Sequence, residues 1–117
     1  MKKYMLLIYG DEQAASQATE EQLHAQVDAY DVFTKSIVAT GAFLDGDPFL
    51  PTSTAKTVEV RDGATKTADG PFERTQQQLF AYYKVQAEND EQALEMASRI
   101  PGARNGTIEV RPVMLFD

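Results

Sequence analysis

An α+β fold, with one antiparallel sheet and two helices on a single face, is predicted by three features of this sequence. Residues 4–9 and 79–85 are apolar on both faces, which indicates two central strands. Two other segments combine a capping-box pattern with apolar residues at helical spacing. The chain of 117 residues shows no shift in composition, so we expect a single domain over residues 1–117.

The first half of the chain predicts a strand, a helix and a second strand. A polar, alanine-rich connection follows the strand at 4–9. Thr19 and Gln22 form the capping box of the first helix, which we expect to end near Gly41. The apolar stripe of this helix consists of Leu23, Val27, Tyr30, Phe33 and Ile37. Residues 42–44 then predict a short strand.

The middle of the chain predicts an extra β-hairpin. Residues 57–61 alternate between polar and apolar side chains, and residues 64–67 return after Asp62-Gly63, a strong signal for a two-residue hairpin turn. The alternation leaves one side of this hairpin polar.

The second half repeats the order of strand, helix and strand. The central strand at 79–85 is followed by a second capping box at 89–92, and Pro101 ends the helix. Residues 107–111 alternate and predict a last strand, and Pro112 indicates either an edge of the sheet or the end of a strand. The whole order is the split βαβ pattern of a ferredoxin-like fold with an extra β-hairpin.

Two helices on one face leave the other face of the predicted sheet uncovered. That face would carry the large side chains of Met5, Leu7, Tyr9, Phe80 and Tyr82. An exposed patch of this kind would exceed the few hundred Å² that a monomer tolerates. A second copy is the simplest cover, because an interface of roughly 800 Å² per partner has ample driving force. We therefore predict an isologous homodimer with its sheets face to face.

The composition argues against several classes of partner and cofactor. Eighteen acidic and eleven basic residues give a formal charge of −7, so we expect neither nucleic acid nor a membrane surface as a partner. The chain has no cysteine and a single histidine, His24, which argues against metal clusters, and we expect no metal and no cofactor. The apolar stretch at the N-terminus is too short for a signal peptide, which predicts a cytoplasmic location.

Asp69 is the main candidate for a catalytic group. The Gly70-Pro71-Phe72 sequence behind it restricts the backbone and would hold its carboxylate in one place. The alternative is a structural turn, in which Asp69 caps nearby backbone amides and Phe72 fills the core. His24 lies off the apolar stripe of its helix, so we expect it to be solvated rather than functional.

Three further residues are candidates for contacts with a substrate. Tyr9 and Tyr83 carry phenols that can donate hydrogen bonds to a carbonyl or carboxylate, although both could equally pack in the core or at the dimer interface. Arg111 could bind a substrate carboxylate, and the alternative is an ion pair on the sheet surface, beside Glu109.

Six segments, spread over nearly the whole chain, carry a family resemblance: 4–11, 69–72, 78–79, 93–95, 100–103 and 109–113. Together they resemble the DGPF-motif branch of the YciI-like, or YCII-related, proteins. The resemblance implies a dimeric α/β barrel of ferredoxin-like subunits in a bacterial cytoplasm, without an assigned reaction. Some members lie beside genes for extracytoplasmic-function sigma factors, which implies a regulatory setting.

The sequence also departs from the family pattern. Arg74 and Gln76 stand where the family usually has an acid and a lysine, and Phe80 and Ala81 replace two glycines. Wider relatives are proposed to use a His–Asp pair, whose histidine has no counterpart at the matching position here. The resemblance therefore carries over Asp69 alone, as an acid–base or ligand-orienting group.

Two functions stay open from the sequence, and so does the question of whether the protein is an enzyme. The first is a cofactor-independent enzyme, or a binder of a small carbonyl or phenolic metabolite, with Asp69, Tyr83 and Arg111 in a cleft between the first helix and the sheet. It requires an open cavity into which Asp69 projects. The second is a non-catalytic dimeric regulatory module linked to transcription, which requires a closed cavity and an apolar patch outside the dimer interface.

Overall fold

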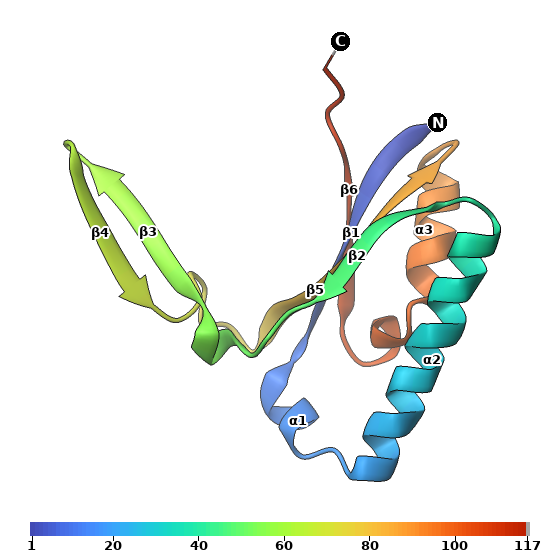
Figure 1. The fold of residues 1–117 in the computed structure, drawn as a ribbon, viewed down its shortest axis with the longest axis horizontal. Coiled ribbons are helices and arrows are strands. Elements are labelled where there is room, and N and C mark those ends of the chain that lie inside the picture. The colour runs from blue at the N-terminus through green and yellow to red at the C-terminus, as the bar shows by residue number, and fades with distance from the viewer. Residues whose placement is uncertain (117) are drawn as a thin grey trace.

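The computed structural model describes residues 1–116, which form a four-stranded antiparallel sheet with helices on one face (Figure 1). The strand order is β2-β5-β1-β6, and each neighbouring pair is antiparallel. The strands are β1 (Lys2–Asp11), β2 (Phe43–Pro48), β5 (Gln77–Ala87) and β6 (Thr107–Pro112). This α+β arrangement is consistent with the ferredoxin-like fold that the sequence predicts, with the long apolar strands β1 and β5 in the centre.

Helices α2 (Glu20–Ala39) and α3 (Asp90–Arg99) cover the same face of the sheet. The capping box of α2 is confirmed, because the Gln22 amide donates to Thr19 Oγ1 at 3.1 Å and the Thr19 amide donates to Gln22 Oε1 at 2.9 Å. A short helix, α1 (Glu12–Ser16), occupies part of the predicted connection. Among residues 1–116, no helix is both long and apolar enough to cross a membrane.

The core lies between the sheet and the two long helices. Side chains alternate along the central strands, so that Leu6 and Ile8 of β1 and Val85 of β5 point toward the helices and are fully buried. Phe33 and Ile37 of α2 pack against these side chains from the helix layer. The first turns of α2 extend beyond the end of the sheet in Figure 1. For this reason the predicted stripe is buried only in its second half, while Leu23 and Val27 remain exposed.

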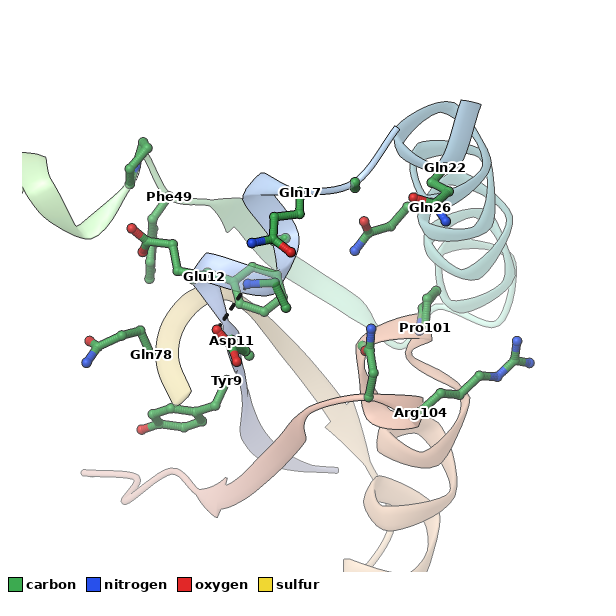
Figure 2. Close-up of a pocket in the computed structure, with 18 of the residues that line it drawn as sticks. Tyr9, Asp11, Glu12, Gln17, Gln22, Gln26, Phe49, Gln78, Pro101 and Arg104 are labelled. Carbon is green, nitrogen blue, oxygen red and sulfur yellow. Dashed lines mark hydrogen bonds between the residues drawn. The ribbon is translucent and has the colours of Figure 1, made fainter. Parts of the chain in front are cut away.

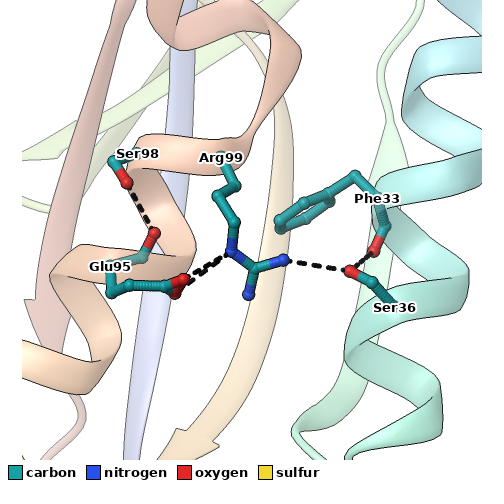
Figure 3. Close-up of polar contacts among 5 residues, drawn as sticks. All are labelled: Phe33, Ser36, Glu95, Ser98 and Arg99. Carbon is teal, nitrogen blue, oxygen red and sulfur yellow. Dashed lines mark hydrogen bonds and ion pairs between the residues drawn. The ribbon is translucent and has the colours of Figure 1, made fainter.

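Polar contacts join the two long helices at the surface (Figure 3). Arg99 of α3 pairs with Glu95 one turn earlier, with Nε and Oε1 2.7 Å apart, and its Nη1 donates to Ser36 Oγ of α2 at 3.1 Å. The guanidinium also lies 5.6 Å from the centre of the Phe33 ring. Solvent-exposed pairs of this kind contribute little stability, so these contacts mainly fix the relative position of the helices.

The face opposite the helices, called here the open face, differs from the prediction at one residue. Met5, Leu7, Tyr9 and Tyr82 lie on it and are half-buried. Phe80 does not, because the pairing of β1 and β5 shifts between Ile8 and Tyr9, and Phe80 falls in this irregularity and packs against the core. The prediction for Phe80 was wrong because a strict alternation takes no account of a bulge.

The extra hairpin is confirmed and forms a separate two-stranded sheet, called here the arm. It consists of β3 (Lys56–Arg61) and β4 (Ala64–Asp69), joined by Asp62 and Gly63, whose φ angles of 52° and 78° suit a tight two-residue turn. In Figure 1 the arm projects away from the sheet on the side opposite α2 and α3. It therefore leaves the subunit on the side of the open face.

Candidate functional site

A cavity of about 710 Å³ lies where α1, the first turns of α2 and one end of the central strands meet (Figure 2). Its apolar lining includes Phe80, which the bulge in β5 turns toward this side, together with Leu50, Pro101 and Ala15. This volume falls within the range of pockets that bind small molecules. The cavity is therefore the candidate site of the chain.

Side-chain amides line the rim of this cavity. Gln17 lies just after α1, Gln22 and Gln26 lie one turn apart on α2, and Asn105 follows the 3₁₀ turn Pro101–Arg104. Figure 2 shows Gln26 extending from α2 toward α1. The side chains of Gln17, Gln26 and Asn105 each offer both a donor and an acceptor of hydrogen bonds, whereas the Gln22 oxygen already accepts from the Thr19 amide. The site therefore combines apolar walls and neutral amides with the charged side chains of Asp11, Glu12 and Arg104.

Two carboxylates in the cavity wall hold α1 in place. Asp11 caps α1 by accepting from the Ala14 amide at 3.1 Å, and its second oxygen accepts from Gln76 Nε2 at 3.0 Å. These hydrogen bonds, that from Gln76 first, lower the pKa of Asp11 below its usual value. Glu12 accepts from the backbone amide of Thr52 at 3.2 Å and from its hydroxyl at 2.9 Å. Both acids are therefore engaged in structural contacts.

Two of the predicted site residues meet on the open face through a shared partner. The Tyr9 hydroxyl donates to Glu109 Oε1 at 3.3 Å, and Arg111 Nη1 donates to Glu109 Oε2 at 3.2 Å. Desolvation raises the pKa of Tyr9, and the neighbouring charge of Glu109 adds to the effect. Tyr9 also lines the cavity, whereas Arg111 does not.

Asp69 lies at the root of the arm, away from the cavity. Its side chain is 84% exposed and its Oδ1 is 2.7 Å from Lys56 Nζ. Gly70 adopts a φ of 95°, and its amide donates to the carbonyl of Ala55 at 2.7 Å, which closes the turn. The alternative that Phe72 fills the core was wrong, because this residue is 79% exposed.

Tyr83 lies in the core on the helix side of the sheet. It is 8% exposed, its hydroxyl is 2.7 Å from Thr34 Oγ1 of α2, and its ring packs edge-on against Phe33 with centroids 5.2 Å apart. Within residues 1–116, the predicted cleft that would unite Asp69, Tyr83 and Arg111 is not formed. These three residues lie at the arm root, in the core and on the open face.

A second cavity, of about 480 Å³, lies at the root of the arm. Tyr9 and Leu79 of the central strands line it on one side. The segments that lead into and out of the arm contribute Leu50, Pro71 and Phe72 on the other side. It therefore occupies the angle between the arm and the open face.

The sequence of the chain matches a known family over nearly its whole length. Residues 2–117 match the model of the YCII-related domain. The chain belongs to the YCII-related family. The family resemblance predicted from the six sequence segments is thereby confirmed. The chain is also similar to an uncharacterized protein of Rhizobium meliloti (strain 1021), with 29% identity over 115 residues that cover 97% of this chain and 93% of the relative.

The amide rim of this YCII-related protein was missed by reasoning from the sequence. The sequence pattern indicates Gln22 only as part of a capping box and predicts no role for Gln26. Their spacing of four residues places them on one face of a helix, and this was the available signal. This signal is weak because glutamine is common on exposed helix surfaces. Only the position of α1 opposite α2 shows that these two glutamines line a cavity.

Proposed function

We propose that this YCII-related protein is a homodimer that binds a small, neutral carbonyl or phenolic metabolite in the cavity beside α1. The observation that carries the proposal is the combination of apolar walls with a rim of side-chain amides. An amide N–H can donate to a carbonyl oxygen, and an amide oxygen can accept from a phenol. Phe80 and Pro101 supply flat apolar surface for the rest of such a ligand.

The charge around the cavity supports a neutral ligand. Asp11 and Glu12 stand in its wall, and the chain carries a formal charge of −7. An anionic metabolite would be repelled by both. Arg104 lines the cavity too, but in Figure 2 its guanidinium extends away from the space between α1 and α2.

The titratable groups of the cavity favour binding over acid–base catalysis. A general acid or base works best with a pKa near the operating pH. The pKa of Asp11 is lowered and that of Tyr9 is raised, so Asp11 stays ionised and Tyr9 stays protonated at neutral pH. His24, the one histidine of the sequence, lies exposed on α2 outside the residues that line the cavity.

The open cavity also weighs against the regulatory module as the main function. That alternative requires the cavity to be closed, because a module that acts only through protein contacts has no use for an internal ligand site. Its regulatory setting is compatible with ligand binding, since a bound metabolite can alter the contacts of a dimer. We therefore keep regulation as a consequence of binding rather than as a separate function.

The dimer part of the proposal rests on the open face. Met5, Leu7, Tyr9 and Leu79 place apolar surface on the two middle strands, and charged side chains stand among them, since Lys84 pairs with Met5 and Glu109 pairs with Leu7. Interfaces between proteins commonly combine buried apolar side chains with polar and charged groups. Light scattering at micromolar concentration should give the mass of a dimer, and a well-folded monomer would contradict this part of the proposal.

A thermal-shift screen of neutral phenols and aromatic ketones tests the ligand site. A ligand at about 100 times its Kd stabilises the folded state by about 2.7 kcal/mol, which is several degrees in Tm. Ala15→Phe places a ring in the cavity and should abolish the shift. Ala25→Phe makes the same change at an exposed position of α2 outside the cavity lining and should preserve it.

The screen has three outcomes that contradict the proposal. The first is that no probe raises the Tm of the wild type. The second is an equal shift in the two phenylalanine variants, which would place the ligand elsewhere. The third is chemical conversion of a bound probe, which would make the protein an enzyme. Asp69→Ala belongs in the same series, because a shift that survives this change does not depend on the carboxylate that the sequence singled out.

A further inference from the structure

The arm exposes a face made of β-branched side chains. Because residues alternate along a strand and Val58 pairs with Thr67 while Val60 pairs with Thr65, these four side chains share one face of the hairpin. Val58 is 64% exposed and Val60 is 57% exposed. The opposite face carries charges such as Glu59 and Lys66 in register with each other. One side of the arm is therefore suited to packing and the other to solvent.

A two-stranded hairpin is at best marginally stable on its own in water. The arm forms a sheet of its own, and all the residues of β4 are exposed. Its strands of six residues nevertheless keep regular antiparallel pairing along their full length. A hairpin of this kind gains stability when its apolar face packs against another surface.

The position of the arm indicates where that surface lies. The arm leaves the subunit on the side of the open face (Figure 1), and the second cavity fills the angle between them. Sheets that pack face to face are about 10 Å apart, whereas six strand residues extend about 20 Å. A protein partner packed on the open face would therefore lie within reach of the arm.

The charge of the arm points to a second copy of this chain as the body on the open face. Residues 56–69 carry three basic and three acidic side chains, so the arm is neutral and the rest of the chain carries the whole charge of −7. Two copies of net charge −7 repel each other at long range, and the neutral arm adds nothing to this repulsion. A neutral arm also lacks the basic surface that an anionic partner such as nucleic acid requires.

We propose that the arm is a dimerisation element, which packs the face formed by Val58, Val60, Thr65 and Thr67 against the partner subunit seated on the open face. This inference rests on the homodimer of the proposed function and adds a second contact to it. It does not depend on the ligand, so a failed ligand screen leaves it standing. In a two-fold dimer the contact occurs twice, because each subunit extends its own arm to the other.

Sedimentation equilibrium of matched variants tests the contact. Val58→Thr with Val60→Thr keeps the shape and strand preference of both residues but makes the face polar. We expect the dimer dissociation constant to rise about 10-fold or more, because four valines lose their apolar burial in each dimer. Glu59→Gln with Lys66→Gln alters the opposite face of the same arm and should leave the constant unchanged.

A single introduced thiol gives a second measurement, because the natural sequence has no cysteine. Val60→Cys and Arg61→Cys place the thiol on opposite faces of the arm. At concentrations where the dimer predominates, alkylation of Val60→Cys should be slower by about 10-fold or more than in the monomer. Alkylation of Arg61→Cys should proceed at the same rate in both states.

Leu7→Lys, on the open face, separates the arm contact from the sheet contact. If Leu7→Lys is monomeric while the valine double variant dimerises like the wild type, the sheets associate without the arm and the inference is wrong. Equal alkylation of the two single-cysteine variants in the dimer would overturn it as well. A wild type that stays monomeric at high micromolar concentration would remove both the homodimer and the arm contact.

Discussion

Tyr82 and Tyr83 are neighbours in the sequence that point to opposite faces of β5, and they offer a matched test of the core. Tyr83→Phe removes a hydroxyl that lies 2.7 Å from Thr34 Oγ1 in a residue that is 8% exposed. The ring and its edge-on contact with Phe33 are kept. Tyr82→Phe removes a hydroxyl that donates to two exposed carboxylates, those of Asp45 and Asp47, at 3.0 and 3.3 Å.

The expected effect of Tyr83→Phe follows from the loss of one hydrogen bond inside the protein. Such a bond contributes about 0.5–1.5 kcal/mol to the free energy of unfolding. For a chain of this length, each kcal/mol corresponds to about 3–6 °C in Tm. We therefore expect Tyr83→Phe to melt several degrees below the wild type. Tyr82→Phe should melt closer to the wild type, because it keeps the ring on the open face and loses only contacts with Asp45 and Asp47, which are exposed in the subunit.

Thermal and urea unfolding of the two variants, with and without a stabilising ligand, test the predicted difference in stability. The shift caused by the ligand should be the same in Tyr83→Phe as in the wild type, since Tyr83 does not line the cavity. A Tyr83→Phe variant of unchanged stability that no longer responds to the ligand would refute the interpretation of Tyr83 as a core residue. Equal destabilisation by both substitutions would show that the Tyr82 hydroxyl is as well buried as that of Tyr83, as the packing of two open faces in the dimer would bring about.

Two further predictions concern α2 and the start of the sheet. Thr19→Ala removes the acceptor of the Gln22 amide and should lower the free energy of unfolding by about 1 kcal/mol, and an unchanged urea midpoint would contradict this. The hydrogen bond to Asp90, with burial, raises the pKa of Tyr4 from 10.0 to about 12. The folded state therefore keeps a proton that the unfolded chain releases, so this stabilisation is complete below pH 10 and is lost as the pH rises toward 12. Urea unfolding across this range should show a smaller alkaline loss in Tyr4→Phe.

The sequence predicted the framework of the fold because its signals are local and strong. The apolar stretches at 4–9 and 79–85 became the central strands, and Asp62-Gly63 makes the turn of the arm. The first capping box begins α2, whereas α3 begins with Asn89 as its N-cap while Gln92 accepts from the Glu88 amide instead of completing the predicted box. The caps and the turn join residues close together in the chain, and each central strand is marked by the apolar residues within its own segment. Reasoning from spacing and turn chemistry therefore succeeds there.

The candidate site was harder to predict because it depends on contacts between distant segments. The short helix α1 looked like a connection, and it is held by Thr52 and Gln76, which lie far away in the sequence. The bulge that turns Phe80 into the cavity depends on the register between β1 and β5. Asp69 was predicted as a site residue because the residues that follow it restrict the backbone. A restricted backbone does not determine where in the fold the side chain lies.

The contacts of Asp11 and Glu12 have a mechanical consequence for the arm. Thr52, which bonds to Glu12, precedes the arm, and Gln76, which bonds to Asp11, follows it. The chain segments before and after the arm are thus both hydrogen-bonded to adjacent residues at the start of α1. A displacement of the arm would therefore transmit force through these hydrogen bonds to the short helix that borders the cavity, which links the outer hairpin mechanically to the interior of the subunit.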